Sequence, residues 1–171
     1  MGRVIAKTFS KKRGLTLKIF ILLLVYSVLS ATVATAADLR TERELAITII
    51  KEAIANETDR RLILSYARVS AVMSELFIEV PSQQNKFAVC DHSTLAFFIP
   101  KVRNTIFVCD RLLTKTSAAI AQTLIHEAIH AAGITDECET TELELSIMRT
   151  SGRGESYQNS YIESCGLKIF S

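Results

Sequence analysis

The sequence predicts an α+β fold that is mainly helical, with a small antiparallel hairpin in front of a long apolar helix. Three observations predict it. Apolar residues recur at helical spacing over residues 40–79, two β-rich runs occupy residues 94–100 and 104–110, and an alanine-rich helical pattern fills residues 116–132. The chain has 171 residues, 49% of them hydrophobic, with six glycines and two prolines. That length suits one hydrophobic core and a single domain.

The N-terminal segment differs from the rest of the chain in composition. Basic residues precede the uncharged stretch at residues 19–33, and the run ATA ends at Ala36. This pattern predicts a signal peptide over residues 1–36 and a mature domain over residues 37–171. The alternative is an uncleaved membrane anchor formed by residues 19–37, because this stretch is nearly long enough to span a bilayer. We therefore expect an exported protein, periplasmic or secreted, that meets the membrane only through an uncleaved leader.

The charge balance changes when the leader is removed. The full chain has 20 basic and 18 acidic residues, and all six charged residues of the leader are basic. The mature chain would keep 14 basic and 18 acidic residues. The positive excess therefore belongs to targeting, and we expect no nucleic-acid partner.

The elements follow in order along the predicted domain. The run TERE begins with Thr41 and predicts an N-terminal capping box, and NETD at residues 56–59 should divide residues 40–79 into two helices. Residues 81–85 are predicted to form a loop and residues 86–91 a further strand. The polar link KVRN should then join the two β-rich runs into a hairpin.

Four cysteines follow the leader, and an even number in an exported chain predicts two disulfides with three possible pairings. Cys90 and Cys109 flank the predicted hairpin, so a bridge between them would clamp the sheet. A bridge from Cys138 to Cys165 would hold the C-terminal tail near the residues discussed next. No C-x-x-C spacing is present to support a thiolate zinc site.

The run HEAIH lies on the predicted helix over residues 116–132. Positions i and i+4 share one helix face, so His126 and His130 can direct one nitrogen each at a common Zn²⁺ ion. Glu127 lies beside them and is expected to act as the general base on the zinc-activated water. Three polar side chains on an otherwise apolar helix require a partner, which favours a metal site over two core histidines.

HEAIH resembles the active-site signature of the zincin metallopeptidases. With Gly133 and Asp136 the run becomes H-E-x-x-H-x-x-G-x-x-D, which is similar to the metzincin clan and to its small secreted snapalysin-type proteases. The resemblance implies a zincin-like fold, zinc as the cofactor and Asp136 as the third ligand. The run SIM at residues 146–148 resembles the metzincin Met-turn, which would place Met148 beneath the metal.

The sequence departs from that pattern after Gly133. Residues 136–149 contain no glycine or proline and predict a helix, with Asp136 and Glu139 as its capping box. Asp136 would then be an N-cap, and the third ligand would come from the helix itself. The alternatives are Glu137, Glu142 and Glu144, and Met148 would then be a core residue of the helix.

These observations predict an exported zinc-dependent metallopeptidase that hydrolyses peptide bonds in a protein or peptide substrate. An alternative is an envelope assembly or binding module with the same zinc site and no turnover. A third is a protein whose working part is the helical segment over residues 40–79, with structural histidines. The intact H-E-x-x-H favours the first, because a site without turnover has no need of Glu127. The oligomeric state is not predicted.

Overall fold

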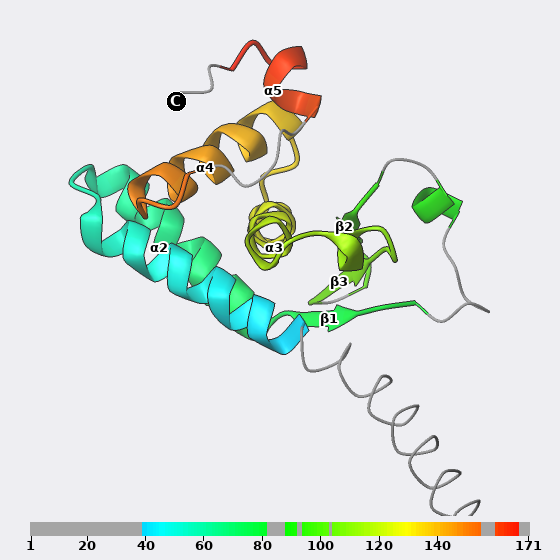
Figure 1. Cartoon of the computed structure of the whole chain (residues 1–171). Helices are drawn as coiled ribbons and strands as arrows, with labels where there is room; N and C mark the ends of the chain where they lie inside the picture. The colour runs from blue at the N-terminus through cyan, green and yellow to red at the C-terminus, as the bar shows by residue number, and fades with distance from the viewer. Residues whose placement is uncertain (1–38, 82–87, 92–93, 103, 155–159, 168–171) are drawn as a thin grey trace, which may run out of the picture. The chain divides into compact units, whose positions relative to one another are not determined.

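The computed structural model describes residues 39–81, 88–91, 94–102, 104–154 and 160–167. Helix α3 (Ser117–Ala131) lies in the middle of this part of the chain and is seen end-on in Figure 1. Every residue from Ala119 to Ile129 is buried. A helix that is apolar on nearly all sides must be enclosed by other elements, which explains its central place.

Two helices precede the sheet, as predicted. Residues 39–56 are helical, a break follows, and α2 spans Arg60–Glu75. The Asp59 side chain caps α2 by accepting a hydrogen bond of 2.7 Å from the Arg61 backbone N–H. The expected N-cap at Thr41 is wrong, because residues 39 and 40 are already helical and Leu39 packs into the core.

The three strands of the described chain form one sheet in the order β1-β3-β2. The predicted hairpin is confirmed: β2 (Ala96–Phe98) pairs antiparallel with β3 (Thr105–Val108). Strand β1 (Phe77–Glu79) pairs parallel with β3, although these residues were predicted to end a helix. The helix ends sooner because Leu76 is extended and the Phe77 N–H donates to the Asn104 carbonyl.

The segment before the hairpin is a short 3-10 helix, η2 (Ala88–Asp91), and is not the predicted strand. The predicted disulfide between Cys90 and Cys109 is confirmed and holds η2 against the end of β3, with the Cα atoms 5.4 Å apart. A residue held in this way does not need strand pairing to keep its place. A second 3-10 turn, η3 (Leu112–Thr114), then leads into α3.

A tight turn joins α3 to α4 (Glu137–Thr150). Gly133 has a φ of 101°, and the Ile134 N–H donates to the Ile129 carbonyl, which is the Schellman arrangement that ends many helices. Asp136 is the N-cap of α4. Residues 146–148 therefore lie within a helix, and Met148 is a buried core residue instead of part of a Met-turn.

The short helix α5 (Ser160–Ser164) packs against α4. The second predicted disulfide, Cys138–Cys165, is confirmed and ties the chain after α5 to the first turn of α4. Two disulfides indicate an oxidising, exported environment. The predicted leader and its cleavage site lie outside the described residues. Among the described helices, none has the length and hydrophobicity to span a membrane.

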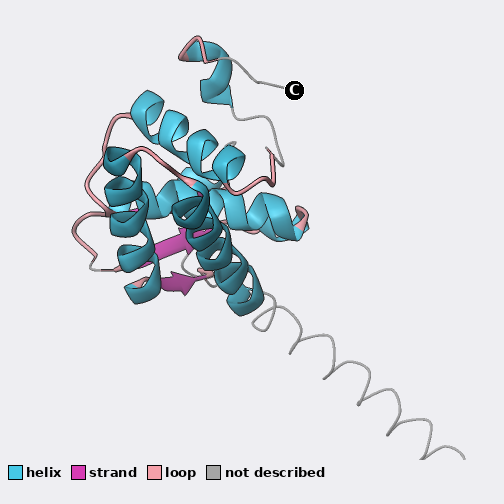
Figure 2. Ribbon diagram, turned by 90° about the vertical axis from the view of Figure 1, so that its left-hand side faces the viewer, coloured by secondary structure: helices cyan, strands magenta, loops and turns pink. Residues whose placement is uncertain are grey.

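The arrangement is thus α+β and mostly helical, with a small sheet. Figure 1 shows α3 between the sheet on one side and the helix over residues 39–56 with α2 on the other, while α4 covers a further side. In the turned view of Figure 2 the strands lie behind the first two helices. α3 packs against α2, α4, β2 and β3. The polar side chains of α3 therefore need partners on these elements.

Candidate metal centre

Three ligand atoms converge where α3 and α4 meet. His126 Nε2 lies 3.2 Å from Glu137 Oε2, and His130 Nε2 lies 3.4 Å from the same oxygen. The ligand atoms of these three residues all fall within 4.8 Å of one another, so the group could hold a metal ion. The two histidines share one face of α3, as the i, i+4 spacing predicts, and their rings meet edge to face. Glu137 comes from the first turn of α4.

The other nitrogen of each imidazole is already engaged. His126 Nδ1 lies 2.7 Å from Glu144 Oε2, and His130 Nδ1 lies 2.7 Å from the Ile134 carbonyl oxygen. Both partners are acceptors, so a neutral ring donates its Nδ1–H and presents the Nε2 lone pair on its other side. Both Nε2 atoms lie on the side where the Glu137 carboxylate approaches. This is the arrangement that metal-binding histidines need.

Of the expected third ligands, Glu137 is the one whose carboxylate lies beside the two histidines. Asp136 Oδ1 accepts a hydrogen bond of 2.9 Å from the Glu139 backbone N–H, so Asp136 caps α4 and does not join the group. Glu142 is exposed and is not part of the group either. Glu137, an alternative in the sequence, supplies the third atom of the group that could hold a metal ion. The expectation that favoured Asp136 differs from the structure because the chain after Gly133 begins a new helix and does not wrap towards the histidines.

Glu127 lies deep in the protein next to the group. Its side chain is buried, and it accepts a hydrogen bond from the Phe98 backbone of strand β2. Burial raises the pKa of Glu127 to about 7, against the opposing attraction of His126. A carboxyl group in this position can hold or release a proton near neutral pH. That property suits a general acid or base.

Two further polar residues continue the site into the protein interior. Glu144 is fully buried, and the Gln122 Nε2–H donates to its Oε1 while its Oε2 faces His126. Burial lowers the pKa of His126, but the hydrogen bond to Glu144 and the negative charges of Glu144, Glu127 and Glu137 together outweigh that effect, so the pKa is raised. Glu144 was expected only as a possible ligand, and Gln122 was not singled out. The position of Gln122, one turn before His126 on the same helix face, was the signal in the sequence that could have identified it as part of the site.

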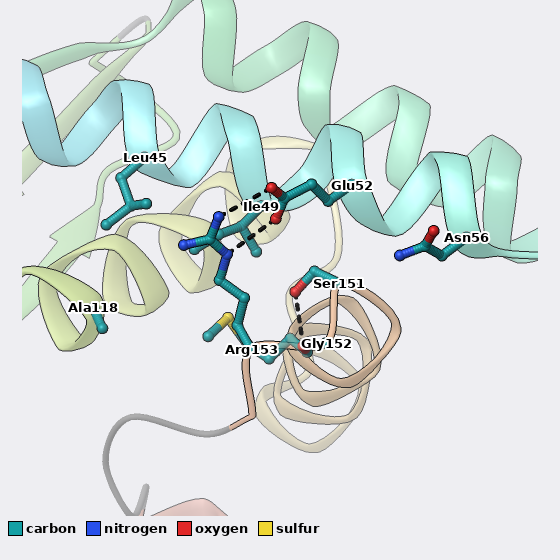
Figure 3. Close-up of a pocket in the computed structure, with 9 residues that line it drawn as sticks. Leu45, Ile49, Glu52, Asn56, Ala118, Ser151, Gly152 and Arg153 are labelled. Carbon is teal, nitrogen blue, oxygen red and sulfur yellow. Dashed lines mark hydrogen bonds and ion pairs between the residues drawn. The ribbon is translucent and has the colours of Figure 1, made fainter.

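A cavity of about 690 Å³ lies away from this group, between the helix over residues 39–56, the start of α3 and the end of α4. Figure 3 shows the Arg153 guanidinium directed at the Glu52 carboxylate, and two hydrogen bonds of 3.0 Å join them. The rest of the lining is largely apolar or uncharged, and none of the predicted site residues except Met148 takes part. Its two charged side chains, Glu52 and Arg153, are paired with each other, so the cavity does not compete with the histidine group as a site of chemistry.

No family model, curated protein or solved structure matches the chain. The function is therefore inferred from the residues and their geometry alone.

Proposed function

We propose that this protein is an exported zinc-dependent metallopeptidase that hydrolyses peptide bonds, with a zincin-like domain. The observation that carries the proposal is the convergence of His126 Nε2, His130 Nε2 and Glu137 Oε2 beside the buried Glu127. Two imidazoles and one carboxylate are a donor set found in catalytic zinc sites, where the fourth position stays open.

The spacing of the ligand atoms is compatible with zinc. Tetrahedral ligands that each lie about 2.0–2.1 Å from zinc are about 3.3–3.4 Å apart. The two distances to Glu137 Oε2, 3.2 and 3.4 Å, agree with that value. Glu137 is also 43% exposed, so solvent and substrate can approach the group from its side. A bound zinc ion would supply Lewis-acid chemistry, lowering the pKa of water and polarising a carbonyl group.

The residues of the chain would then divide the remaining work. His126, His130 and Glu137 would hold the ion, and Glu127 would take a proton from the attacking water and later deliver it to the leaving amine. The Phe98 backbone holds Glu127 in place from strand β2, which pairs only with β3 among the described strands. The other edge of β2 gives an extended peptide a place to pair beside the general base.

The experiment is a comparison of zinc content and hydrolysis in three proteins. Glu127→Gln should keep the zinc and lose hydrolysis of a mixed peptide library, because an amide cannot accept the proton from water. Glu142→Gln is the matched control, since it makes the same change at an exposed site on α4, and it should retain both properties. If the wild-type protein bound zinc and cleaved no peptide, the peptidase proposal would fail and the binding module without turnover would replace it.

A further inference from the structure

A polar seam runs between α3 and α4 and continues behind the proposed metal site. On α3, Gln122, His126 and His130 follow one another at intervals of four residues and share one face. On α4, Glu144 faces Gln122 and His126, and Glu137 faces the two histidines. One end of this seam reaches solvent at Glu137, whereas Gln122 and Glu144 are 0% exposed.

A fully buried carboxylate requires compensation. Removing a carboxylate from water is costly unless it is hydrogen-bonded and paired with positive charge. Gln122 supplies a hydrogen bond to Glu144 but no charge. The imidazole of His126 joins Glu144 to the point where the three ligand atoms converge. A cation held there would balance Glu144 through the ring, and Glu137 with Glu144 would together match a charge of two.

We propose that Glu144 and Gln122 are positioning residues for a divalent cation at His126. Gln122 orients the Glu144 carboxylate, and Glu144 accepts a hydrogen bond from the Nδ1–H of His126. This hydrogen bond keeps the ring in the tautomer that carries its proton on Nδ1 and directs Nε2 at the ion. The proposal depends on the metal site of the proposed function, but not on hydrolysis. Carboxylate partners of this kind are typically worth 10–100-fold in metal affinity.

A purely structural role is the competing explanation, because Gln122 and Glu144 also join α3 to α4. The two roles differ in what they change. A structural link affects the stability of the zinc-free protein and leaves zinc affinity unaltered. A positioning role changes zinc affinity and the protonation of the His126 ring.

The test measures the zinc dissociation constant by competition with a chromophoric chelator, and thermal stability with zinc removed. Glu144→Gln keeps the shape and removes the charge, and we expect zinc to bind about 10–100-fold more weakly. Gln122→Leu should weaken zinc binding less, because the charge of Glu144 remains. Thr141→Val is the matched control: Thr141 is buried on α4 and its Oγ1 has no hydrogen-bond partner among the described residues, so zinc affinity should be unchanged.

Unaltered zinc affinity in Glu144→Gln, with reduced thermal stability, would overturn the proposal in favour of a structural link. Since a replacement can also prevent folding, nitrogen-15 NMR of the zinc-free wild-type protein gives a second measurement. At a pH where the His126 ring is neutral, we expect its proton on Nδ1, and a proton on Nε2 would overturn the proposal. Zinc binding without hydrolysis would remove the peptidase and leave this proposal in place, whereas failure of the wild-type protein to bind zinc would remove both.

Discussion

At the scale of single residues, adjacent acidic side chains at the start of α4 take different roles. Asp136 satisfies a free backbone N–H of the helix, while Glu137, one position later, points its carboxylate at two histidines. An N-cap residue lies half outside the helix, and the residue after it already follows the helical path. That difference decides which carboxylate meets α3.

The first prediction separates these two residues. Glu137→Ala should weaken zinc binding strongly, because it removes one of the three proposed ligands. Asp136→Ala should leave zinc affinity nearly unchanged and lower the free energy of unfolding by about 1 kcal/mol through loss of the cap. Zinc titration and denaturant unfolding of both variants check this, and the reverse pattern would restore Asp136 as the ligand.

The second prediction concerns the pH dependence of the zinc-free protein. The pKa of Glu127 is about 7 in the folded chain and 4.5 without its surroundings. Between these values the unfolded chain loses the Glu127 proton while the folded chain keeps it. This group therefore lowers the free energy of unfolding as pH rises from about 4.5 to 7, by roughly 3 kcal/mol in total.

Glu127→Gln removes that titration. With zinc chelated, the wild-type protein should lose stability relative to Glu127→Gln between pH 5 and pH 8, as measured by urea unfolding at each pH. A difference in stability that stays constant over this range would show that Glu127 ionises as readily in the folded chain as in the unfolded one.

At the scale of elements, much of the fold could be predicted from the sequence because the signals were local. The break at residues 57–59, the hairpin, α3 and α4 follow from caps, turns and periodicity within short segments. Strand β1 could not be found in this way. Its residues FIE continue a helical pattern, and only pairing with β3, far along the chain, makes them extended.

The site divides in the same way. His126, Glu127 and His130 lie on one helix and their spacing predicts their positions. The third ligand depends on how α4 packs against α3, and the resemblance that favoured Asp136 carries no information about that packing. Gln122 and Glu144 belong together only in the folded chain, because 22 residues separate them.

The third prediction uses the two disulfides as matched elements. The Cys138–Cys165 bridge ends next to Glu137, on the first turn of α4. Replacing both cysteines with serine should weaken zinc binding, since that turn loses its tie to the chain after α5. The same change at Cys90 and Cys109 should leave zinc affinity intact. Each pair should cost about 2–4 kcal/mol of stability.

Unfolding curves and chelator competition on the two double variants check this. If loss of the Cys90–Cys109 bridge weakened zinc binding as much as loss of the Cys138–Cys165 bridge, the weaker binding would result from general destabilisation and not from a displaced Glu137.

At the scale of the whole molecule, the core and the proposed site depend on the same helix. α3 contributes apolar side chains in nearly every direction and carries the polar seam on the face towards α4. Zinc binding should therefore stabilise the entire described domain. At a free zinc concentration about 100 times the dissociation constant, the free energy of unfolding should rise by about 2.7 kcal/mol.

The most direct test of the account is the zinc content of the purified protein, measured by elemental analysis alongside His126→Ala and His130→Ala. We expect about one zinc per wild-type chain and loss of that zinc in both variants, because a site with three protein ligands cannot lose one histidine without a large loss of affinity. Full zinc retention in both variants, or a wild-type protein that binds no zinc, would contradict it.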